Sequence, residues 1–259
     1  MLSACSGFNL FGPPKIKEEP IVPPQTLYAV ALEQMDKGSF QTAIKTLQKL
    51  ERQHPYSDFN ERAKLMEIYA NYRLSKYDEA VLAADRYLAL YPGSKEVPYV
   101  LYLKGSSYYA EIKDITRDQQ ISRNAIDTFQ LLMANYPNSD YAKDAREKMS
   151  VSTDQLAGKE MSVGRYYLGN GQYGAAINRF KVVVDKYQTS THIEEALYRL
   201  TEANLALGLV NEAQTATAVL GHNYPASSWY KEAYALLQKQ GLEAKVVSGS
   251  SLENALKKG

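Results

Sequence analysis

The chain has 259 residues, 45% of them hydrophobic, and its 30 basic and 29 acidic residues leave a formal net charge of +1. This near-neutral charge, with no basic stripe, argues against nucleic acid as the main ligand. No run of about eighteen apolar residues occurs, so the sequence predicts no transmembrane helix.

The first segment in chain order surrounds the only cysteine, Cys5, which ends the tetrapeptide Leu2-Ser3-Ala4-Cys5. This tetrapeptide resembles the lipobox of bacterial lipoproteins, in which the cysteine thiol receives a diacylglycerol. The charged and apolar parts of a signal peptide are missing before it. We therefore expect lipidation at Cys5 and a truncated or displaced start at Met1, the alternative being a chance match of four residues.

Residues 6–25 contain five prolines and no helical periodicity. Proline-rich chains favour the extended polyproline conformation at about 3.1 Å per residue, so 20 such residues reach up to about 60 Å. We interpret residues 1–25 as a lipobox remnant followed by a tether.

Beyond residue 25 the chain repeats. Five times an alanine is followed after eleven residues by a ring side chain, after twelve by proline (Gln188 is the one exception) and after fourteen by serine. The alanines are Ala43, Ala80, Ala125, Ala176 and Ala213, and the serines are Ser57, Ser94, Ser139, Ser190 and Ser227.

Each element of the repeat has a physical reading. Proline cannot continue a helix, because it lacks the amide donor and clashes with the preceding turn. A serine two residues later suits the N-cap of the next helix. The small alanine marks a close contact between helices, and aromatic residues at helical spacing predict the core positions Phe40, Tyr77, Tyr167, Tyr173 and Phe180.

The unit resembles the tetratricopeptide repeat (TPR), a pair of antiparallel helices of about 34 residues. The sequence thus predicts an all-α superhelical solenoid of five TPR-like helix pairs plus a C-terminal helix. The alanines are 37, 45, 51 and 37 residues apart, which indicates two insertions. The first falls within 111–124 as a loop or short helix, and the second lengthens a helix predicted over 140–168.

We divide the repeats into an N-terminal region, 26–139, with the first three units, and a C-terminal region, 140–241, with the last two units and the final helix. Residues 242–259 are polar, and we expect them to be disordered.

The lipobox remnant, tether, five units and Arg-Asp-Gln-Gln insertion at 117–120 together resemble the BamD family, the TPR lipoproteins of the outer-membrane β-barrel assembly machine. The resemblance covers about residues 1–240, with Gln188, Ser122 and the missing signal peptide as departures. It implies a non-catalytic scaffold on the periplasmic face of the outer membrane, anchored through lipid on Cys5. Its implied partners are the barrel-forming subunit, other lipoproteins of the machine and unfolded outer-membrane proteins.

Two kinds of alternative stay open. A pilus-assembly pilotin or a cell-envelope constriction coordinator is also a periplasmic TPR lipoprotein. A cytosolic co-chaperone that clamps a C-terminal carboxylate is a poorer match, because that clamp needs basic residues where this chain has mainly tyrosine, leucine and methionine.

In TPR units the first-helix positions 5, 9 and 12 line a concave groove. Here those positions predict an aromatic and apolar groove for a substrate peptide, formed by Tyr28, Leu32, Met35, Leu65, Tyr69, Tyr72, Tyr102 and Tyr109, with Ser106 between the last two. Such a surface suits a barrel strand, which alternates apolar residues and ends in aromatic ones. The alternative is that these side chains belong to the core.

For docking of the C-terminal units to the barrel-forming subunit, arginine is a typical interface residue that forms bidentate pairs with carboxylates. The candidates are Arg165, Arg179 and Arg199, and the alternative is a solvated helix face.

The sequence predicts no enzyme, cofactor or metal site. The three histidines, His54, His192 and His222, lack metal-ligand spacing, and no phosphate-binding glycine loop occurs.

Overall fold

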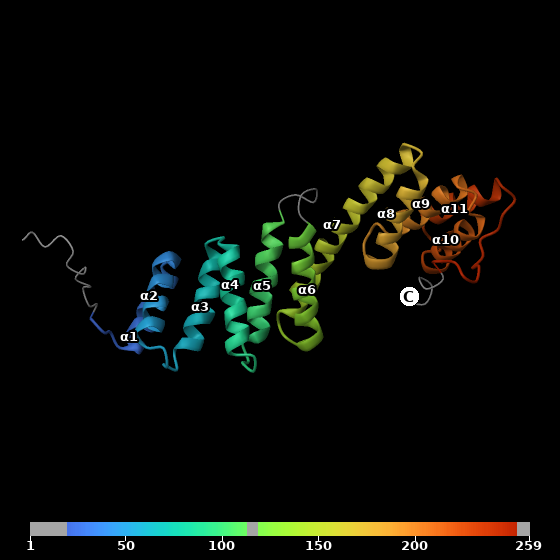
Figure 1. Cartoon of the computed structure of the whole chain (residues 1–259). Coiled ribbons are helices and arrows are strands. Elements are labelled where there is room, and N and C mark those ends of the chain that lie inside the picture. Colours follow the sequence, from blue (N-terminus) through green and yellow to red (C-terminus); the bar gives the residue numbers. More distant parts are fainter. Residues whose placement is uncertain (1–19, 113–118, 253–259) are drawn as a thin grey trace, which may run out of the picture.

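The computed structural model describes residues 20–112 and 119–252 and shows a row of helices joined by short turns (Figure 1). The helices are α1 (Pro24–Asp36), α2 (Phe40–Gln53), α3 (Asn60–Arg73), α4 (Tyr77–Leu90), α5 (Val97–Glu111), α6 (Gln119–Asn135), α7 (Ala142–Gly169), α8 (Tyr173–Lys186), α9 (Ile193–Ala206), α10 (Val210–Asn223) and α11 (Ser228–Gln238).

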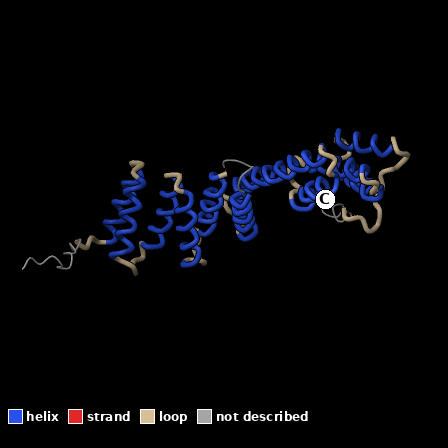
Figure 2. Tube along the Cα trace, turned by 45° about the horizontal axis from the view of Figure 1, so that its top comes forward, coloured by secondary structure: helices blue, strands red, loops and turns tan. Residues whose placement is uncertain are grey.

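The predicted architecture is confirmed. Each helix packs against the next, so α1 to α10 form five antiparallel pairs, and α11 closes the row against α9 and α10. Figure 2 shows only helices and loops in the described portion of the chain, drawn out into an elongated body. None of the described helices combines the length and the apolar composition that a membrane crossing requires.

The repeat residues take the packing roles that the sequence indicates. All five repeat alanines are fully buried. A second small residue faces the partner helix in two units: a Cβ atom added at Gly105 would lie 2.5 Å from the Phe129 ring, and one added at Gly164 would lie 2.4 Å from the Phe180 ring. Of the predicted core aromatics, Phe180 is fully buried, whereas Phe40, Tyr77, Tyr167 and Tyr173 are only partly covered.

The turn inside a pair requires a residue with positive φ. Gly38, Gly171 and Gly208 occupy this position at φ values of 72°, 71° and 72°. The second pair has Ser75 there, at a φ of 57°. Glycine adopts this conformation without a steric penalty, whereas a side chain does not, so the second pair has the strained version of this turn.

The prolines end helices as predicted, but the serines mostly do not act as N-caps. The helices before Pro55, Pro92, Pro137 and Pro225 each end two residues ahead of the proline. Only Ser227 is an N-cap, with its Oγ accepting from Trp229 N at 3.1 Å. The other four serines lie three residues before the first helical residue, and their carbonyls accept from the amide at that residue in a preceding turn.

The hydroxyl of Ser94 explains some of this difference. Ser94 Oγ donates to Glu61 Oε1 at 2.6 Å and lies 2.9 Å from the Tyr87 hydroxyl. Its lone pairs also accept from Glu96 N at 3.1 Å. The serine therefore ties the turn before α5 to both helices of the second pair.

The long helix predicted over 140–168 is confirmed as α7, with 28 residues. Its first half packs in a core cluster with α5 and α6, through Ala145, and its second half packs with α8, through Leu156 and Met161. This single helix thus joins the two regions of the molecule, as Figure 1 shows. Residues 113–118, the centre of the other predicted insertion, lie outside the described residues.

The predicted disorder from Leu242 is wrong for residues 242–252. This segment runs back along α10: Gln214 Nε2 donates to Glu243 O at 2.8 Å, and Val247 N donates to Thr215 Oγ1 at 3.1 Å. Leu252 is only 2% exposed in the C-terminal core. Polar composition misled the prediction, because α10 offers side-chain partners for the segment.

The end of the predicted tether also contacts the repeats. Val22 N donates to Gln53 Oε1 at 3.1 Å, and Val22 O lies 2.7 Å from His54 Nε2. Helix α1 begins at Pro24, so it starts inside the segment predicted as the tether. Cys5 and the rest of the lipobox lie outside the described residues.

Candidate binding surfaces

Most of the predicted groove residues are partly exposed on the first helices of the pairs. Tyr28 and Leu32 lie on α1, Tyr69 and Tyr72 on α3, and Tyr102 and Tyr109 on α5. The other predicted members, Met35, Leu65 and Ser106, are buried, and the first two belong to core clusters. We refer to the six partly exposed residues, together with Tyr99 and Tyr141, as the tyrosine surface.

The centre of the tyrosine surface lies where α5 meets the start of α7. The Tyr141 ring stacks on Tyr99 and Tyr102, with centroid separations of 5.0 and 5.2 Å. Tyr69 and Tyr72 from α3 pack against the same core cluster as Tyr99. Tyrosines from three consecutive pairs thus form one continuous patch, and burial raises the pKa of Tyr99 to about 12, so its hydroxyl stays protonated.

One charged pair lies at the edge of this patch. Tyr102 OH donates to Asp144 Oδ2 at 2.6 Å, and Lys148 forms an ion pair with the same carboxylate. Lys148 Nζ also lies 5.4 Å from the centroid of the Tyr102 ring and 5.9 Å from that of Tyr109. Burial acts to raise the pKa of Asp144, but the bonds from Lys148 and Tyr102 outweigh it and hold that pKa below its ordinary value.

A second cation lies nearer the N-terminus. The Arg73 guanidinium carbon is 4.9 Å from the centroid of the Phe40 ring and 5.5 Å from that of Tyr69, and its Nη1 donates to the Tyr69 hydroxyl. Tyr28 packs on Phe59 at 5.3 Å. The rings are therefore held by contacts within the protein, so they offer contact area at low entropic cost.

Four contributors were missed from the sequence: Tyr99, Tyr141, Asp144 and Lys148. Tyr99 lies about one helical turn before Tyr102, so extending the position rule by three residues would have found it. The other three lie at the start of the long helix α7, whose extra turns a repeat of about 34 residues does not contain. The long spacing between Ala125 and Ala176 was the available signal.

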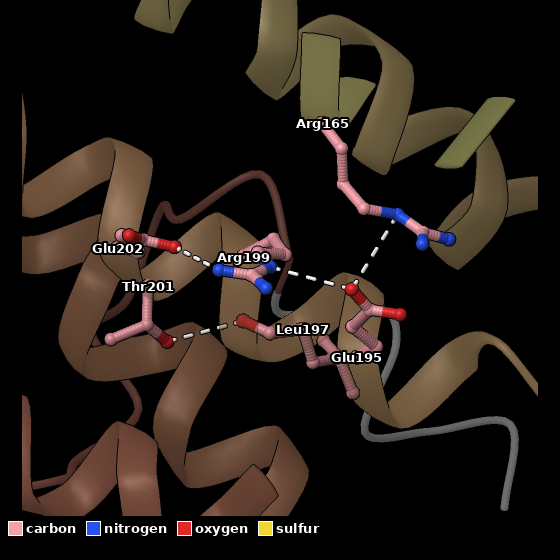
Figure 3. Close-up of polar contacts among 6 residues, drawn as sticks. All are labelled: Arg165, Glu195, Leu197, Arg199, Thr201 and Glu202. Carbon is pink, nitrogen blue, oxygen red and sulfur yellow. Dashed lines mark hydrogen bonds and ion pairs between the residues drawn. The ribbon is translucent and has the colours of Figure 1, made fainter. Parts of the chain in front are cut away.

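The second candidate surface is an arginine cluster in the C-terminal region, drawn in Figure 3. Arg165 on α7 and Arg199 on α9 share one carboxylate: their Nε atoms lie 3.6 and 3.4 Å from Glu195 Oε1. Arg199 Nη1 also pairs with Glu202 Oε2 at 2.8 Å. In Figure 3 the terminal nitrogens of Arg165 point away from Glu195, and this side chain is nearly half exposed.

Aromatic rings fix Arg199 in place. Its guanidinium carbon lies 5.0 Å from the centroid of Tyr198 and 5.8 Å from that of Trp229, and these two rings pack at 5.2 Å. Burial acts to lower the pKa of Arg199, but the bonds to Glu202 and Glu195 raise it overall. An arginine held by rings and carboxylates resembles the rigid centre of a protein interface.

Arg179 does not belong to this cluster. It lies on α8 and pairs with Glu160 on α7, Nη1 to Oε2 at 3.1 Å. The structure thus brings together two of the three predicted docking arginines and separates the third.

No group of three or more histidine, cysteine, aspartate or glutamate side chains that could hold a metal is found within 20–112 and 119–252. Both surfaces offer contact area, hydrogen bonds and charge.

Comparison with known proteins gives a family match over most of the chain. The model of the YfiO family, described as "Outer membrane lipoprotein", matches residues 20–220. A protein of Caulobacter vibrioides is 44% identical over 238 residues, which cover 91% of this chain and 78% of that protein, and it is named "Outer membrane protein assembly factor BamD".

A protein of Rickettsia prowazekii with the same name is 40% identical over 84% of this chain and 87% of that protein. One of Neisseria meningitidis serogroup B is 33% identical over 80% of this chain and 82% of that protein. Among solved structures, the type IV pilus biogenesis factor PilW overlaps 80% of this chain and 96% of its own, at 18% identity and a TM-score of 0.30. That likeness is too loose to support any inference.

Proposed function

Because the chain belongs to the YfiO family of outer membrane lipoproteins, and its relatives are named outer membrane protein assembly factors, we propose a division of labour within this assembly factor. The chain acts as a scaffold in outer membrane protein assembly. The tyrosine surface of α1, α3, α5 and α7 receives unfolded barrel proteins, and the arginine cluster docks the barrel-forming subunit. Neither task involves catalysis.

The observation that carries the first proposal is the continuous patch of tyrosines from three consecutive pairs. Extended barrel segments carry alternating apolar residues and terminal aromatics. Rigid rings with hydroxyls at their edges can contact such side chains and hydrogen-bond to an exposed backbone at the same time. The contacts to Arg73 keep a cation beside the rings of Phe40 and Tyr69, which favours a segment that ends in a carboxylate, whereas Asp144 balances the charge of Lys148.

The experiment is a binding titration with a fluorescent peptide that has the sequence of a C-terminal barrel strand. Tyr69→Ala with Tyr72→Ala should weaken binding about tenfold, because both rings that α3 contributes to the tyrosine surface are lost. The matched control is Tyr56→Ala with Tyr166→Ala, which removes two tyrosines that are 99% and 69% exposed elsewhere. Equal affinity of both variants, with helicity intact, would remove the substrate-binding proposal.

The second proposal is carried by the shared carboxylate. Glu195 and Glu202 balance the charges of Arg165 and Arg199, but Arg165 faces Glu195 only through its Nε atom and is nearly half exposed. Its terminal nitrogens are therefore available to donate to a carboxylate of the partner. Attachment to the outer membrane through lipid on Cys5 completes the proposal, and intact mass of the native protein tests it: a mass increase equal to a diacylglycerol and further acyl chains is expected. An unmodified Cys5 would exclude this anchor.

A further inference from the structure

A separate pocket lies between the second helices of the first two pairs. It has a volume of about 670 Å³ and is lined by α2 and α4, with α3 between them. On α3 its lining residues are Lys64 and Glu67, which fall on a different side of the helix from Tyr69 and Tyr72, because successive residues are about 100° apart. We call it the α2–α4 pocket, and it is distinct from the tyrosine surface.

The acidic side chains of this pocket are already engaged. Glu51 forms an ion pair with Lys64, and Glu67 Oε1 accepts from Gln48 Nε2 at 2.7 Å. Two further cations, Arg52 on α2 and Arg86 on α4, line opposite walls and are exposed. Among the residues that the structure describes, neither has a hydrogen-bonded or ionic partner. The pocket therefore presents two guanidinium groups without a partner on separate helices. Its three cations exceed its two carboxylates by one charge, and within the described part of the chain Glu67 is bonded only to the neutral Gln48.

The pocket also has an apolar side. Ala83, Ala89 and Leu90 of α4 line it, and Leu90 is 58% exposed. Arginine is enriched at protein interfaces, and covering an exposed leucine with an apolar side chain of a partner removes apolar surface from water.

We propose that the α2–α4 pocket binds an acidic segment of a partner protein, with two carboxylates that meet Arg52 and Arg86 and an apolar side chain that covers Leu90. Charge complementarity argues for this occupant. The two guanidinium groups come from different helices, so they suit two carboxylates spaced along a peptide better than one compact anion. The pocket is recessed between helices, which a peptide can enter and a flat lipid surface cannot.

The test is a fluorescence anisotropy titration of the full chain with a fluorescein-labelled peptide of repeating Glu-Leu-Glu. The reference peptide has lysine in place of glutamate. We expect the acidic peptide to bind at least about tenfold more tightly than the lysine peptide. We also expect Arg52→Glu with Arg86→Glu to weaken that binding about tenfold.

The matched control is Arg62→Glu with Arg146→Glu, which changes the net charge equally at two exposed arginines outside the pocket. It should change affinity less than about twofold. Circular dichroism checks that both variants keep their helices, and Tyr69→Ala with Tyr72→Ala should leave binding unchanged, so this proposal and the substrate-binding proposal can fail separately.

Three results would overturn the proposal. The acidic peptide could fail to bind the wild-type chain at millimolar concentration, or both charge-reversed variants could lose affinity equally. The third is that Arg52→Glu with Arg86→Glu abolishes binding to phosphatidylglycerol vesicles, or self-association measured by sedimentation, and leaves peptide binding unchanged. That result would assign the pocket to lipid or to a second copy of the chain.

Discussion

The three N-terminal pairs and the two C-terminal pairs share the same repeat, but their hydrophobic cores are organised differently. In the N-terminal region the buried residues fall into four small clusters, each shared by neighbouring helices. The C-terminal region has a single cluster, which extends from α7 through α11 to Leu252. A solenoid whose units contact only their neighbours loses structure locally, whereas a shared core unfolds as a unit. The comparison suggests an adaptable surface for varied substrates beside a rigid one for a fixed partner.

The largest predicted effect comes from substitutions that disrupt a close contact between a glycine and a phenylalanine of the partner helix, one in each region. Gly164→Ala places a methyl group against the fully buried Phe180, and Gly105→Ala does the same against Phe129. Overpacking of this kind costs about 2 kcal/mol. Hydrogen exchange should show reduced protection throughout α7–α11 for Gly164→Ala and only near α5 and α6 for Gly105→Ala. An equal loss over the whole chain in both variants would contradict the comparison.

The next effect concerns docking. Arg165→Glu with Arg199→Glu should lower co-purification of the barrel-forming subunit about tenfold, because the charge offered to the partner is reversed. Arg179→Glu changes an arginine that lies outside the cluster and should reduce it less. If Arg179→Glu has the larger effect, the docking surface lies on the α7–α8 side of the molecule.

The C-terminal segment gives a smaller effect with a pH dependence. Ser250 Oγ and Ser251 Oγ donate to Glu212 Oε2 at 2.7 and 3.1 Å, and Ser251 N donates to Oε1 at 3.2 Å. Burial acts to raise the pKa of Glu212, but these bonds lower it overall, below the ordinary value of 4.5. Because the folded pKa is the lower one, the stabilisation is present above about pH 4.5 and is lost as the pH falls through the folded pKa.

Glu212→Gln removes the charge and should weaken the attachment of residues 242–252 by about 1 kcal/mol at neutral pH. Hydrogen exchange of the Val247 and Leu252 amides measures the loss of attachment. After correction for the intrinsic pH dependence of amide exchange, acidification should lower the protection factors in the wild-type chain and have little effect on them in the variant. The same acid response in both would assign the pH dependence to another group.

The smallest effect is stabilising. Ser75→Gly should raise the stability of the second pair by about 0.5 kcal/mol, since glycine adopts the positive φ that Ser75 has under strain. Thermal unfolding measures it, with Gly38→Ser as the matched reverse change in the first pair. A loss of stability in Ser75→Gly would show that the unfolded-state entropy of glycine outweighs the strain.

The fold was predictable because its determinants are local and repeated. Each proline, turn glycine and small alanine acts within one helix pair, so Ala43 and Ala213 could be assigned by the same rule. The serines were less predictable: Ser94 has a partner, Glu61, in a neighbouring helix, which no spacing rule contains. Met35 and Leu65 are buried because each packs against the next pair, Met35 in a cluster with Ala70 and Leu65 in one with Val100.

The candidate sites were predictable only in outline. Tyr69, Tyr72 and Tyr102 followed from the repeat positions, but Tyr141 and Lys148 lie at the start of the lengthened helix α7. The attachment of residues 242–252 depends on Glu212 and Thr215, which lie more than 30 residues away in sequence. Contacts of this kind are set by tertiary packing, and polar composition alone suggests the opposite.

The most direct measurement is photo-crosslinking in the native envelope with a photoreactive amino acid at one position at a time. A probe in place of Tyr72 should capture newly made barrel proteins, and a probe in place of Arg165 should capture the barrel-forming subunit. Capture of the barrel-forming subunit at position 72 and of unfolded barrel proteins at position 165 would contradict the division of labour between the two regions.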